Sequence, residues 1–501
     1  MSSLRFRDTG RFRDAWLRNP RVELLSGLVV ALALIPEAIS FSIIAGVDPK
    51  VGLYASFSIA IIISIAGGRS GMISAATGAM ALVVVPLVEE HGVAYLFAAT
   101  VLAGAIQVVL GLLGIGALMR FVPRTVMVGF VNALAILIFL AQVPHIVLSD
   151  DPDRARLGLN LLVIVVGLVI IYGLPRFTRA VPSPLVAIVV LAGAATVLDL
   201  DLPTVGDMGE LPSALPVLSL PDVPFTVETF TIILPFAITM AMVGLLESLL
   251  TAQLLDDLTD TQSDKNLESR GQGIANVATG FLGGMAGCAM IGQSMINHRS
   301  GGRTRLSTLA SGVFLLVLIL GLGDLVAEIP MAALVSVMIM VSVGTFNFRS
   351  IAPHTLRHSP RTETTVMVVT VGIVVLTHNL AYGVVVGVLL SAVFFARHVS
   401  GVVKVTSVVD PDNVERLYAV SGELFFASTN DLVRSFDYDA VKVARVEIDL
   451  SGARVWDTSA VAALDAVVAK FAERGIDAEL VGLNHHSERL HARTTGTLSG
   501  H

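Results

Sequence analysis

Long apolar runs dominate the first four-fifths of the chain. Stretches of about twenty mostly hydrophobic residues, long enough to cross the ~30 Å hydrocarbon core of a bilayer, recur through residues 22–400. Over residues 401–501 the runs give way to the alternating and helical patterns of an ordinary soluble domain. We therefore predict a polytopic membrane domain and a small C-terminal domain, preceded by an N-terminal arm over residues 1–21.

The membrane domain is predicted to be all-α, with fourteen transmembrane segments. Several of these segments are short or interrupted by glycine. They are placed at residues 23–47, 51–66, 74–88, 92–117, 125–146, 157–174, 184–200, 228–255, 270–284, 286–297, 304–322, 325–345, 364–378 and 380–398.

The distribution of arginine and lysine orients these segments, because short cytoplasmic loops hold an excess of both residues. With the N-terminus inside, the inner loops and their edges contain thirteen such residues and the outer loops contain three. The longest outer connection, residues 199–228, carries six acidic residues and no basic one. Both termini are therefore predicted to be cytoplasmic, with the arginine-rich arm as a cytoplasmic anchor and no removable signal peptide.

The long outer connection divides the membrane domain into seven plus seven segments, which would insert with opposite orientations as inverted repeats. Matching features support the repeat. The first segment of each half contains a proline and, further along, a glutamate: Pro36 and Glu37 in one half, Pro235 and Glu247 in the other. The third segment of each half is short and begins in small or polar residues, at 74–80 and 287–294. Paired, interrupted segments of this kind indicate a binding site near the middle of the membrane.

Composition excludes several classes of protein. Only 15% of residues are charged and 54% are hydrophobic, and a net charge of −7 without a basic cluster argues against a nucleic-acid partner. The sequence contains no HExxH, paired-cysteine zinc pattern, P-loop or GxSxG motif, so neither a recognisable hydrolase nor an ATP-driven pump is supported. We expect a secondary transporter, not an enzyme, and no cofactor other than Na⁺ as a coupling ion.

Glu247 lies inside a predicted segment, one helical turn before Thr251, so that both side chains face the same side of the helix. A carboxylate in mid-membrane is costly and usually functional. With a hydroxyl beside it, it suits the binding of Na⁺ or the carriage of a proton. The alternative is a protonated glutamate that hydrogen-bonds between helices for packing.

Glu37 follows Pro36, and we expect the proline to break the helix and to free backbone groups beside the carboxylate. Glu37 would then take part in the binding site, or bind or exclude a proton. The alternative is a glutamate that only caps the break.

The two short third segments offer the opposite charge. A helix that begins in mid-membrane presents unpaired N–H groups and about half a positive charge, so two such helix starts form an anion site without any lysine or arginine. The candidates are residues 77–80 and 289–294. The alternative is close helix packing through small residues.

Several motifs resemble the SulP family of inorganic anion transporters. They are the runs at 35–41 (IPEAISF) and 51–57 (VGLYASF), the pair Thr77-Gly78, the run at 271–276 (GQGIAN), and the segment from Asn297 to Thr304 ending in Gly-Gly-Arg-Thr. The likeness covers nearly the whole chain, and the C-terminal domain resembles an α/β STAS domain.

The resemblance implies a bacterial cytoplasmic (inner) membrane protein, a core domain and a gate domain, and a homodimer. Carried over residue by residue, it implies substrate binding between the third and tenth segments, lined by the first and eighth. The implied coupling-ion residues, which are also the metal ligands if the ion is Na⁺, are Glu247 and Thr251. The implied substrate-binding residues are Glu37, Phe41, Thr77, Gly78, Ala79, Ala289, Met290 and Ile291.

Two residues depart from the family pattern, since many members have Gln at the position of Glu37 and the sodium-coupled type has Asp at that of Glu247. Both departures leave the choice between Na⁺ and H⁺ open.

In the STAS-like domain, strands are expected at 414–426 and 444–450, with a helix from about Ser459. Ser459 matches the position that is phosphorylated in anti-sigma-factor antagonists, although serine is also a good helix N-cap, and we favour the cap.

The sequence therefore predicts an elevator-type transporter that carries sulfate or bicarbonate with Na⁺ or H⁺. Because backbone N–H groups bind many anions alike, chloride or a dicarboxylate fits the same site. Two alternatives stay open: an uncoupled exchanger or channel-like protein, and a membrane-anchored signalling protein in which the STAS domain acts.

Overall fold

The computed structural model describes residues 16, 19–114, 116, 123–147, 154–177, 182–377, 380–401, 403–409, 415–439, 441 and 443–495. Most of the predicted N-terminal arm, residues 1–21, lies outside them. The chain forms two compact units, Met1–Gly387 and Val388–His501, and each is described by itself.

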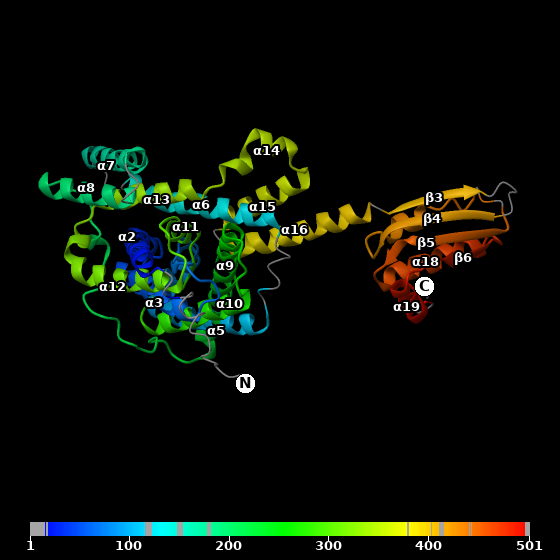
Figure 1. Ribbon diagram of the computed structural model, residues 1–501, viewed down its shortest axis with the longest axis horizontal. Coiled ribbons are helices and arrows are strands. Elements are labelled where there is room, and N and C mark those ends of the chain that lie inside the picture. The colour runs from blue at the N-terminus through cyan, green and yellow to red at the C-terminus, as the bar shows by residue number, and fades with distance from the viewer. Residues whose placement is uncertain are drawn as a thin grey trace. The chain divides into compact units, whose positions relative to one another are not determined.

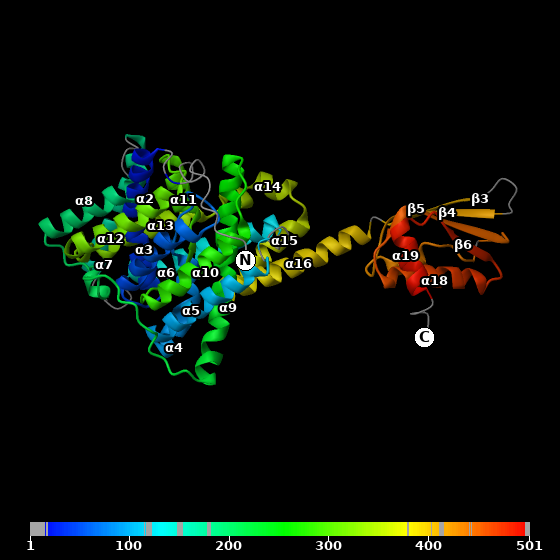
Figure 2. The same cartoon turned by 60° about the horizontal axis from the view of Figure 1, so that its bottom comes forward.

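The first unit is mostly helical (Figure 1, Figure 2). Each of the fourteen predicted segments coincides with a helix or with a short strand followed by a helix. Eight helices within the described residues are long and apolar enough to cross a membrane. The elements are α2 Pro20–Ile44, α3 Pro49–Ala66, β1 Ser74–Ala76, α4 Gly78–His91, α5 Val93–Leu112, α6 Arg124–Val147, α7 Arg154–Gly173, α8 Ser183–Val197, α9 Val227–Thr259, α10 Lys265–Phe281, β2 Gly287–Ala289, α11 Ile291–Arg299, α12 Arg305–Ala327, α13 Met331–Thr345, η4 Phe348–Ile351, α14 Pro353–His358 and α15 Arg361–Thr377. The last helix, α16 Leu380–Ser400, begins in the first unit and ends in the second.

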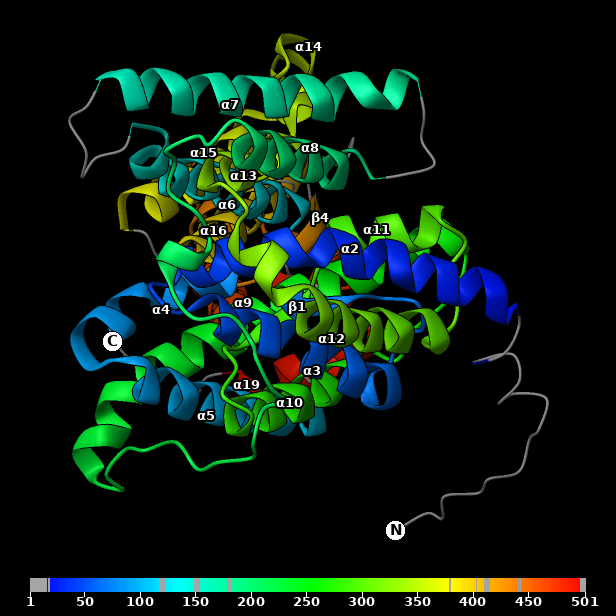
Figure 3. The same cartoon turned by 90° about the vertical axis from the view of Figure 1, so that its left-hand side faces the viewer.

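The helices pack in two groups. One group contains α2 to α5 and α9 to α12, in which α10 packs on α5 and α3, and α12 on α2 and α3. The other contains α6, α7, α8, α13 and α15, in which α6 packs on α13 and α15. Figure 3 shows the groups as two layers, with β1 in the first group. The count of fourteen crossings, the inverted repeat, and the names core and gate for the two groups stay predictions.

The two strands correct the expectation of an all-α membrane domain. β1 and β2 pair antiparallel, with Ser74 opposite Ala289 and Ala76 opposite Gly287. An added Cβ at Gly287 would lie 2.1 Å from the carbonyl oxygen of Ala75, so the pairing requires glycine there. The ladder supplies hydrogen bonds to chain segments that have left helical geometry inside the unit.

The expected helix break at Pro36 is absent, because α2 runs through it from Pro20 to Ile44. A proline inside a helix removes one backbone hydrogen bond, and neighbouring helices and Ser or Thr side chains compensate for it in membrane helices. Here Ser40 Oγ donates to the carbonyl of Pro36 at 2.8 Å. Glu37 therefore projects from a continuous helix.

Close contact between α5 and α10 depends on two glycines. An added Cβ on Gly104 would lie 2.6 Å from the carbonyl oxygen of Gly273, and one on Gly273 would lie 2.5 Å from the carbonyl oxygen of Gly104. Small residues at such crossings let two helix backbones approach closely inside a membrane. Gly273 belongs to the 271–276 motif, so this part of the motif has a packing role.

The second unit is a small α/β domain around a four-stranded sheet with the order β3-β4-β5-β6. β3 and β4 are antiparallel, whereas β4 with β5 and β5 with β6 are parallel. Its core includes the fully buried side chains of Ile448, Leu464 and Phe471. The elements are β3 Lys404–Val409, β4 Glu415–Leu424, α17 Thr429–Arg434, β5 Arg445–Val455, α18 Thr458–Ala472, β6 Asp477–Val481 and α19 His485–Thr494.

The expected N-cap at Ser459 is wrong. Asp457 is the N-cap of α18, and its Oδ1 accepts a hydrogen bond from the backbone N–H of Ala460 at 2.9 Å. Ser459 lies in the first turn of the helix, partly exposed. The sequence carries both good capping residues, and the aspartate, two positions earlier, takes the cap.

The α5–α10 contact predicts that Gly273→Ala destabilises the protein. The new methyl group would overlap a backbone oxygen, and overpacking of this kind costs about 1–3 kcal/mol. Thermal unfolding in detergent should show a lower midpoint. Gly193→Ala in α8 is the matched control, since nothing lies within 4 Å of a Cβ there. A Gly273→Ala protein as stable as the control would contradict this account of the crossing.

Candidate anion and coupling-ion site

The β1–β2 ladder places the starts of α4 and α11 at its two opposite ends. One residue separates β1 from Gly78, the first residue of α4, and one separates β2 from Ile291, the first residue of α11. Because the strands are antiparallel, the two helices leave the ladder in opposite directions. The ladder is buried and only three residue pairs long, so both N-terminal partial positive charges lie beside it in the interior of the first unit.

Several N–H groups at these helix starts have no partner. Within the described residues, the backbone N–H groups of Gly78 and Ala79 in α4, and of Ile291, Gly292 and Gln293 in α11, meet no hydrogen-bond acceptor. α11 has no side-chain cap, and Thr77 caps α4 only through a 3.4 Å bond from Met80 N to its Oγ1. Unpaired N–H groups at a buried helix start are ready to bind an anion.

Polar side chains hold the ladder from both sides. Asn276 on α10 accepts a hydrogen bond from the N–H of Gly287 at 2.9 Å and donates to its carbonyl at 3.1 Å. Asn276 also donates to Oε1 of Gln107 on α5 at 2.8 Å. Ser248 Oγ on α9 accepts from the N–H of Ala289 at 3.0 Å. These bonds satisfy the backbone of β2 and fix its position.

Glu247 reaches the ladder through a cysteine. Cys288 Sγ lies 2.9 Å from Glu247 Oε2 and 3.2 Å from Thr77 Oγ1, and the thiol is fully buried. The thiol donates its single proton to the carboxylate, so in the contact with Thr77 the hydroxyl is the donor and the sulfur the acceptor. A chain of hydrogen bonds thus joins the start of α4 to Glu247.

Thr251 lies one turn beyond Glu247 on α9, as expected. Its hydroxyl donates to the carbonyl of Glu247 at 2.8 Å and lies 3.4 Å from the carbonyl of Ala289. The hydroxyl of Thr251 thus contacts two backbone carbonyls, those of Glu247 and Ala289, while the carboxylate of Glu247 contacts the thiol of Cys288.

Glu37 meets the start of α11. Its Oε1 accepts a 2.7 Å hydrogen bond from Nε2 of Gln293, in the first turn of that helix, and both side chains are buried. Phe41, one turn further along α2, covers the start of α4, since an added Cβ on Gly78 would lie 2.9 Å from its ring. α2 therefore contacts both helix starts.

The structure thus brings the ten predicted substrate and coupling-ion residues together on α2, on α9 and on the two strand–helix segments. Ser459 lies in the second unit, and its phosphorylation stays a prediction. Three residues that contact this site were not predicted from the sequence, because each is an ordinary small or polar residue of a membrane helix or strand: Gln107, Ser248 and Cys288. Gln293 lies within the predicted segment 289–294, but its contact with Glu37 was not predicted.

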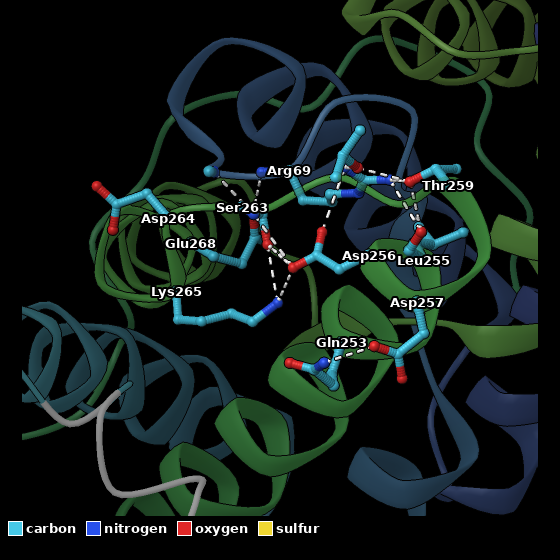
Figure 4. Close-up of polar contacts among 12 residues, drawn as sticks. Arg69, Gln253, Leu255, Asp256, Asp257, Thr259, Ser263, Asp264, Lys265 and Glu268 are labelled. Carbon is cyan, nitrogen blue, oxygen red and sulfur yellow. Dashed lines mark hydrogen bonds and ion pairs between the residues drawn. The ribbon is translucent and has the colours of Figure 1, made fainter.

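A charged cluster fixes the chain that enters β1 (Figure 4). The guanidinium of Arg69 lies 3.3 Å from Asp256 at the end of α9, and Lys265 at the start of α10 lies 2.5 Å from the same carboxylate. Glu268, fully buried, accepts from the backbone N–H groups of Gly68 and Arg69 at 2.7 and 3.0 Å. These contacts join the ends of α3, α9 and α10 beside the site.

Comparison with known proteins agrees with this architecture. The sequence signature described as the sulfate permease family matches residues 21–153 and 150–370, and that of the STAS domain matches residues 406–497. A Bacillus subtilis (strain 168) protein named "Putative sulfate transporter YbaR" is 59% identical over 478 residues, which cover 95% of this chain and 98% of that protein.

Two solved structures are also similar. The transmembrane domain of the cyanobacterial bicarbonate transporter BicA is 29% identical, with a TM-score of 0.62 over 75% of this chain and 97% of that chain. The murine solute carrier 26 family member A9 anion transporter, in the inward-facing state, superposes with a TM-score of 0.81 over 96% of this chain and 88% of that chain, at 17% identity.

Fold, helix starts and sequence together define a membrane-spanning protein of transporter type with a C-terminal STAS domain. The chain belongs to the sulfate permease family. The motifs of the first, third and ninth segments had already indicated its resemblance to this family.

The support of β2 by Asn276 predicts a strong effect of Asn276→Ala. The change removes three hydrogen bonds and leaves the buried N–H of Gly287 unpaired, at a cost of about 1–3 kcal/mol for that group alone. Thermal unfolding should show a lower midpoint. Gln253→Ala, which removes one exposed bond to Asp257, serves as control. Equal stability of the two variants would show that Asn276 does not hold the ladder.

Proposed function

We propose that the protein is a secondary active transporter of a small inorganic anion, sulfate or bicarbonate, across a bacterial cytoplasmic membrane. The relatives support this class, since one is named a sulfate transporter and another a bicarbonate transporter. The observation that carries the proposal is the pair of helix starts at the ladder, with five unpaired N–H groups within the described residues.

The anion would bind at these N–H groups. Gly78, Ala79 and the first turn of α11 would donate hydrogen bonds to it, so the site would hold its anion by backbone dipoles. Within the described residues, every hydrogen bond to the side chains of Glu37 and Glu247 comes from an uncharged group. The two carboxylates oppose the anion unless a cation neutralises them, which favours coupled transport over an uncoupled exchanger.

Glu247 would take up the coupling ion. A proton would neutralise the carboxylate directly, whereas Na⁺ would be bound by the carboxylate, the hydroxyl of Thr251 and a backbone carbonyl. In both cases the neutral site is easier to move through a low-dielectric environment. Cys288 would act as a positioning residue, because its thiol links the carboxylate to the start of α4.

The transport step is proposed to be an elevator movement. The group of α2 to α5 with α9 to α12 would carry the site. It would move against the other group, which contains α6, α7, α8, α13 and α15. The proposal includes cytoplasmic termini, as the loop charges indicate, and a homodimer, as the resemblance to the family implies.

Glu247→Gln tests the coupling role. The amide keeps the size of the side chain but has no negative charge for a proton or Na⁺ to neutralise, so accumulation of labelled sulfate or bicarbonate in proteoliposomes should fall to the equilibrium level under both gradients. Uptake is measured with an imposed Na⁺ gradient and, separately, with an imposed H⁺ gradient. Asp257→Asn, an exposed change on the same helix, should leave accumulation intact. Unchanged gradient dependence in Glu247→Gln would remove Glu247 from the mechanism.

Cys288 variants test the hydrogen-bond chain. Alanine removes the bond to the carboxylate, and a bond to a charged group contributes about 1.5–3 kcal/mol, so the half-saturating concentration of the coupling ion should change about tenfold. Cys288→Ser keeps a donor and an acceptor and should restore most of the wild-type dependence. If the alanine and serine variants have the same half-saturating concentration of the coupling ion, and both unfold at the wild-type temperature, the thiol does not link the carboxylate to the start of α4.

A further inference from the structure

A cavity lies outside the anion site, where α6 and α15 begin. Its volume is about 530 Å³, and it is bounded by the first turns of these two helices together with η4 and α14. Its lining includes two arginines, Arg124 at the start of α6 and Arg349 in η4. None of the predicted substrate or coupling-ion residues contributes to it.

The charge of the cavity favours an anion. Within the part of the chain that the structure describes, neither Arg124 nor Arg349 forms an ion pair with a carboxylate. Glu363 also lines the cavity, so the three charged side chains sum to a positive charge. A guanidinium presents a planar fork of donors that matches phosphate geometry.

Four hydroxyl groups around the same space are free to donate. Thr125, Thr355, Ser359 and Thr364 line the cavity, and none of their hydroxyls has a hydrogen-bond partner among the described residues. By contrast, Ser350 Oγ is already engaged, since it accepts from Asn132 and donates to the carbonyl of Asn347. The cavity therefore offers two cationic forks and four further donors.

The two helix starts add to the positive potential. Both helices begin with the same tripeptide, Pro-Arg-Thr, at 123–125 and 360–362. The proline carbonyls accept the first helical hydrogen bonds, and a proline side chain cannot cap the free N–H groups. Because the partial positive charge of a helix concentrates in its first turn, it supports an anion that the arginines hold.

Size and lining indicate what carries the anionic group. Small-molecule sites occupy about 300–1,000 Å³, so this cavity is suited to a group larger than a bare inorganic ion. Val128 and Met367 give it an apolar side that fits a carbon moiety. By the loop-charge orientation, the cavity faces the cytoplasmic side, where lipid headgroups and soluble phosphate esters are both present.

We propose that this cavity binds a phosphate-bearing organic anion, held by Arg124, Arg349 and the surrounding hydroxyls, at a place separate from the transported anion. The ligand is the glycerophosphate headgroup of an anionic phospholipid or a soluble phosphate ester of similar size. Glu363 limits the affinity, because its carboxylate faces the same space.

Binding is measured on the purified full-length protein in phospholipid-free detergent, with two probes. Isothermal titration with glycerol 3-phosphate tests the soluble source, and titration with short-chain phosphatidylglycerol, against phosphatidylcholine of equal chain length, tests the lipid source. If phosphatidylglycerol binds saturably and glycerol 3-phosphate does not bind, the site is assigned to lipid. If both probes bind and compete with each other for one site, it is assigned to the shared phosphate chemistry. Binding of glycerol 3-phosphate without phosphatidylglycerol assigns it to soluble esters.

The variants decide whether the cavity is responsible. Arg124→Gln with Arg349→Gln should weaken binding at least tenfold, whereas Glu363→Gln should strengthen it. Arg361→Gln is the matched control: it changes the same charge at the same helix position of the same tripeptide but lies outside the lining. Because Glu363→Gln gains affinity, a loss of folding in the double variant does not hide the answer. Failure of wild-type protein to bind either probe, or equal affinity in all four proteins, overturns the proposal.

Discussion

The antiparallel pairing of β1 and β2 is the constraint on which the membrane unit depends. Two chain segments have to leave helical geometry inside an apolar environment, where no water satisfies their backbone groups. Pairing them with each other solves this problem for both at once. It also determines where two helices begin and in which directions they run, so the unpaired N–H groups of these helix starts follow from the same hydrogen bonds that stabilise the fold.

The ladder is in turn held by side chains that would otherwise be costly inside a membrane. Asn276 and Gln107 support one edge of β2, Ser248 supports its far end, and Gly287 provides the space that the pairing needs. Buried polar residues of this kind fix a position only when their partners are complete. The polar network around β2 thus serves both the fold and the site, and Cys288 extends it to the carboxylate of Glu247.

Much of the fold could be predicted from the sequence, because a helix that crosses the membrane is visible as an apolar run of matching length. The fourteen expected segments all meet a helix, and the interruption at the third and tenth segments was visible as small and polar residues. The strands themselves were not predictable, since three residues carry no periodicity. Two local expectations failed because a competing interaction prevailed: neighbouring groups keep α2 helical through Pro36, and Asp457 takes the cap expected of Ser459.

The candidate site was predictable where a residue is unusual for its surroundings, as Glu37 and Glu247 are in apolar helices. The contacts of Cys288 and Gln293 were not, because only the fold places them against these carboxylates. The cavity at the starts of α6 and α15 is lined by residues of helices that lie far apart in the sequence, so no local pattern reveals it.

Anion binding at the two helix starts is tested most directly by observing the unpaired N–H groups themselves. Solid-state NMR of protein labelled with ¹⁵N-glycine and ¹⁵N-isoleucine in bilayers would follow the amide signals of Gly78, Ile291 and Gly292 while sulfate or bicarbonate is added. If the anion binds there, these signals should shift saturably at the concentrations that saturate uptake, and the amide signal of Gly193 should not shift. Unchanged signals of Gly78, Ile291 and Gly292 under saturating anion would contradict anion binding at the helix starts.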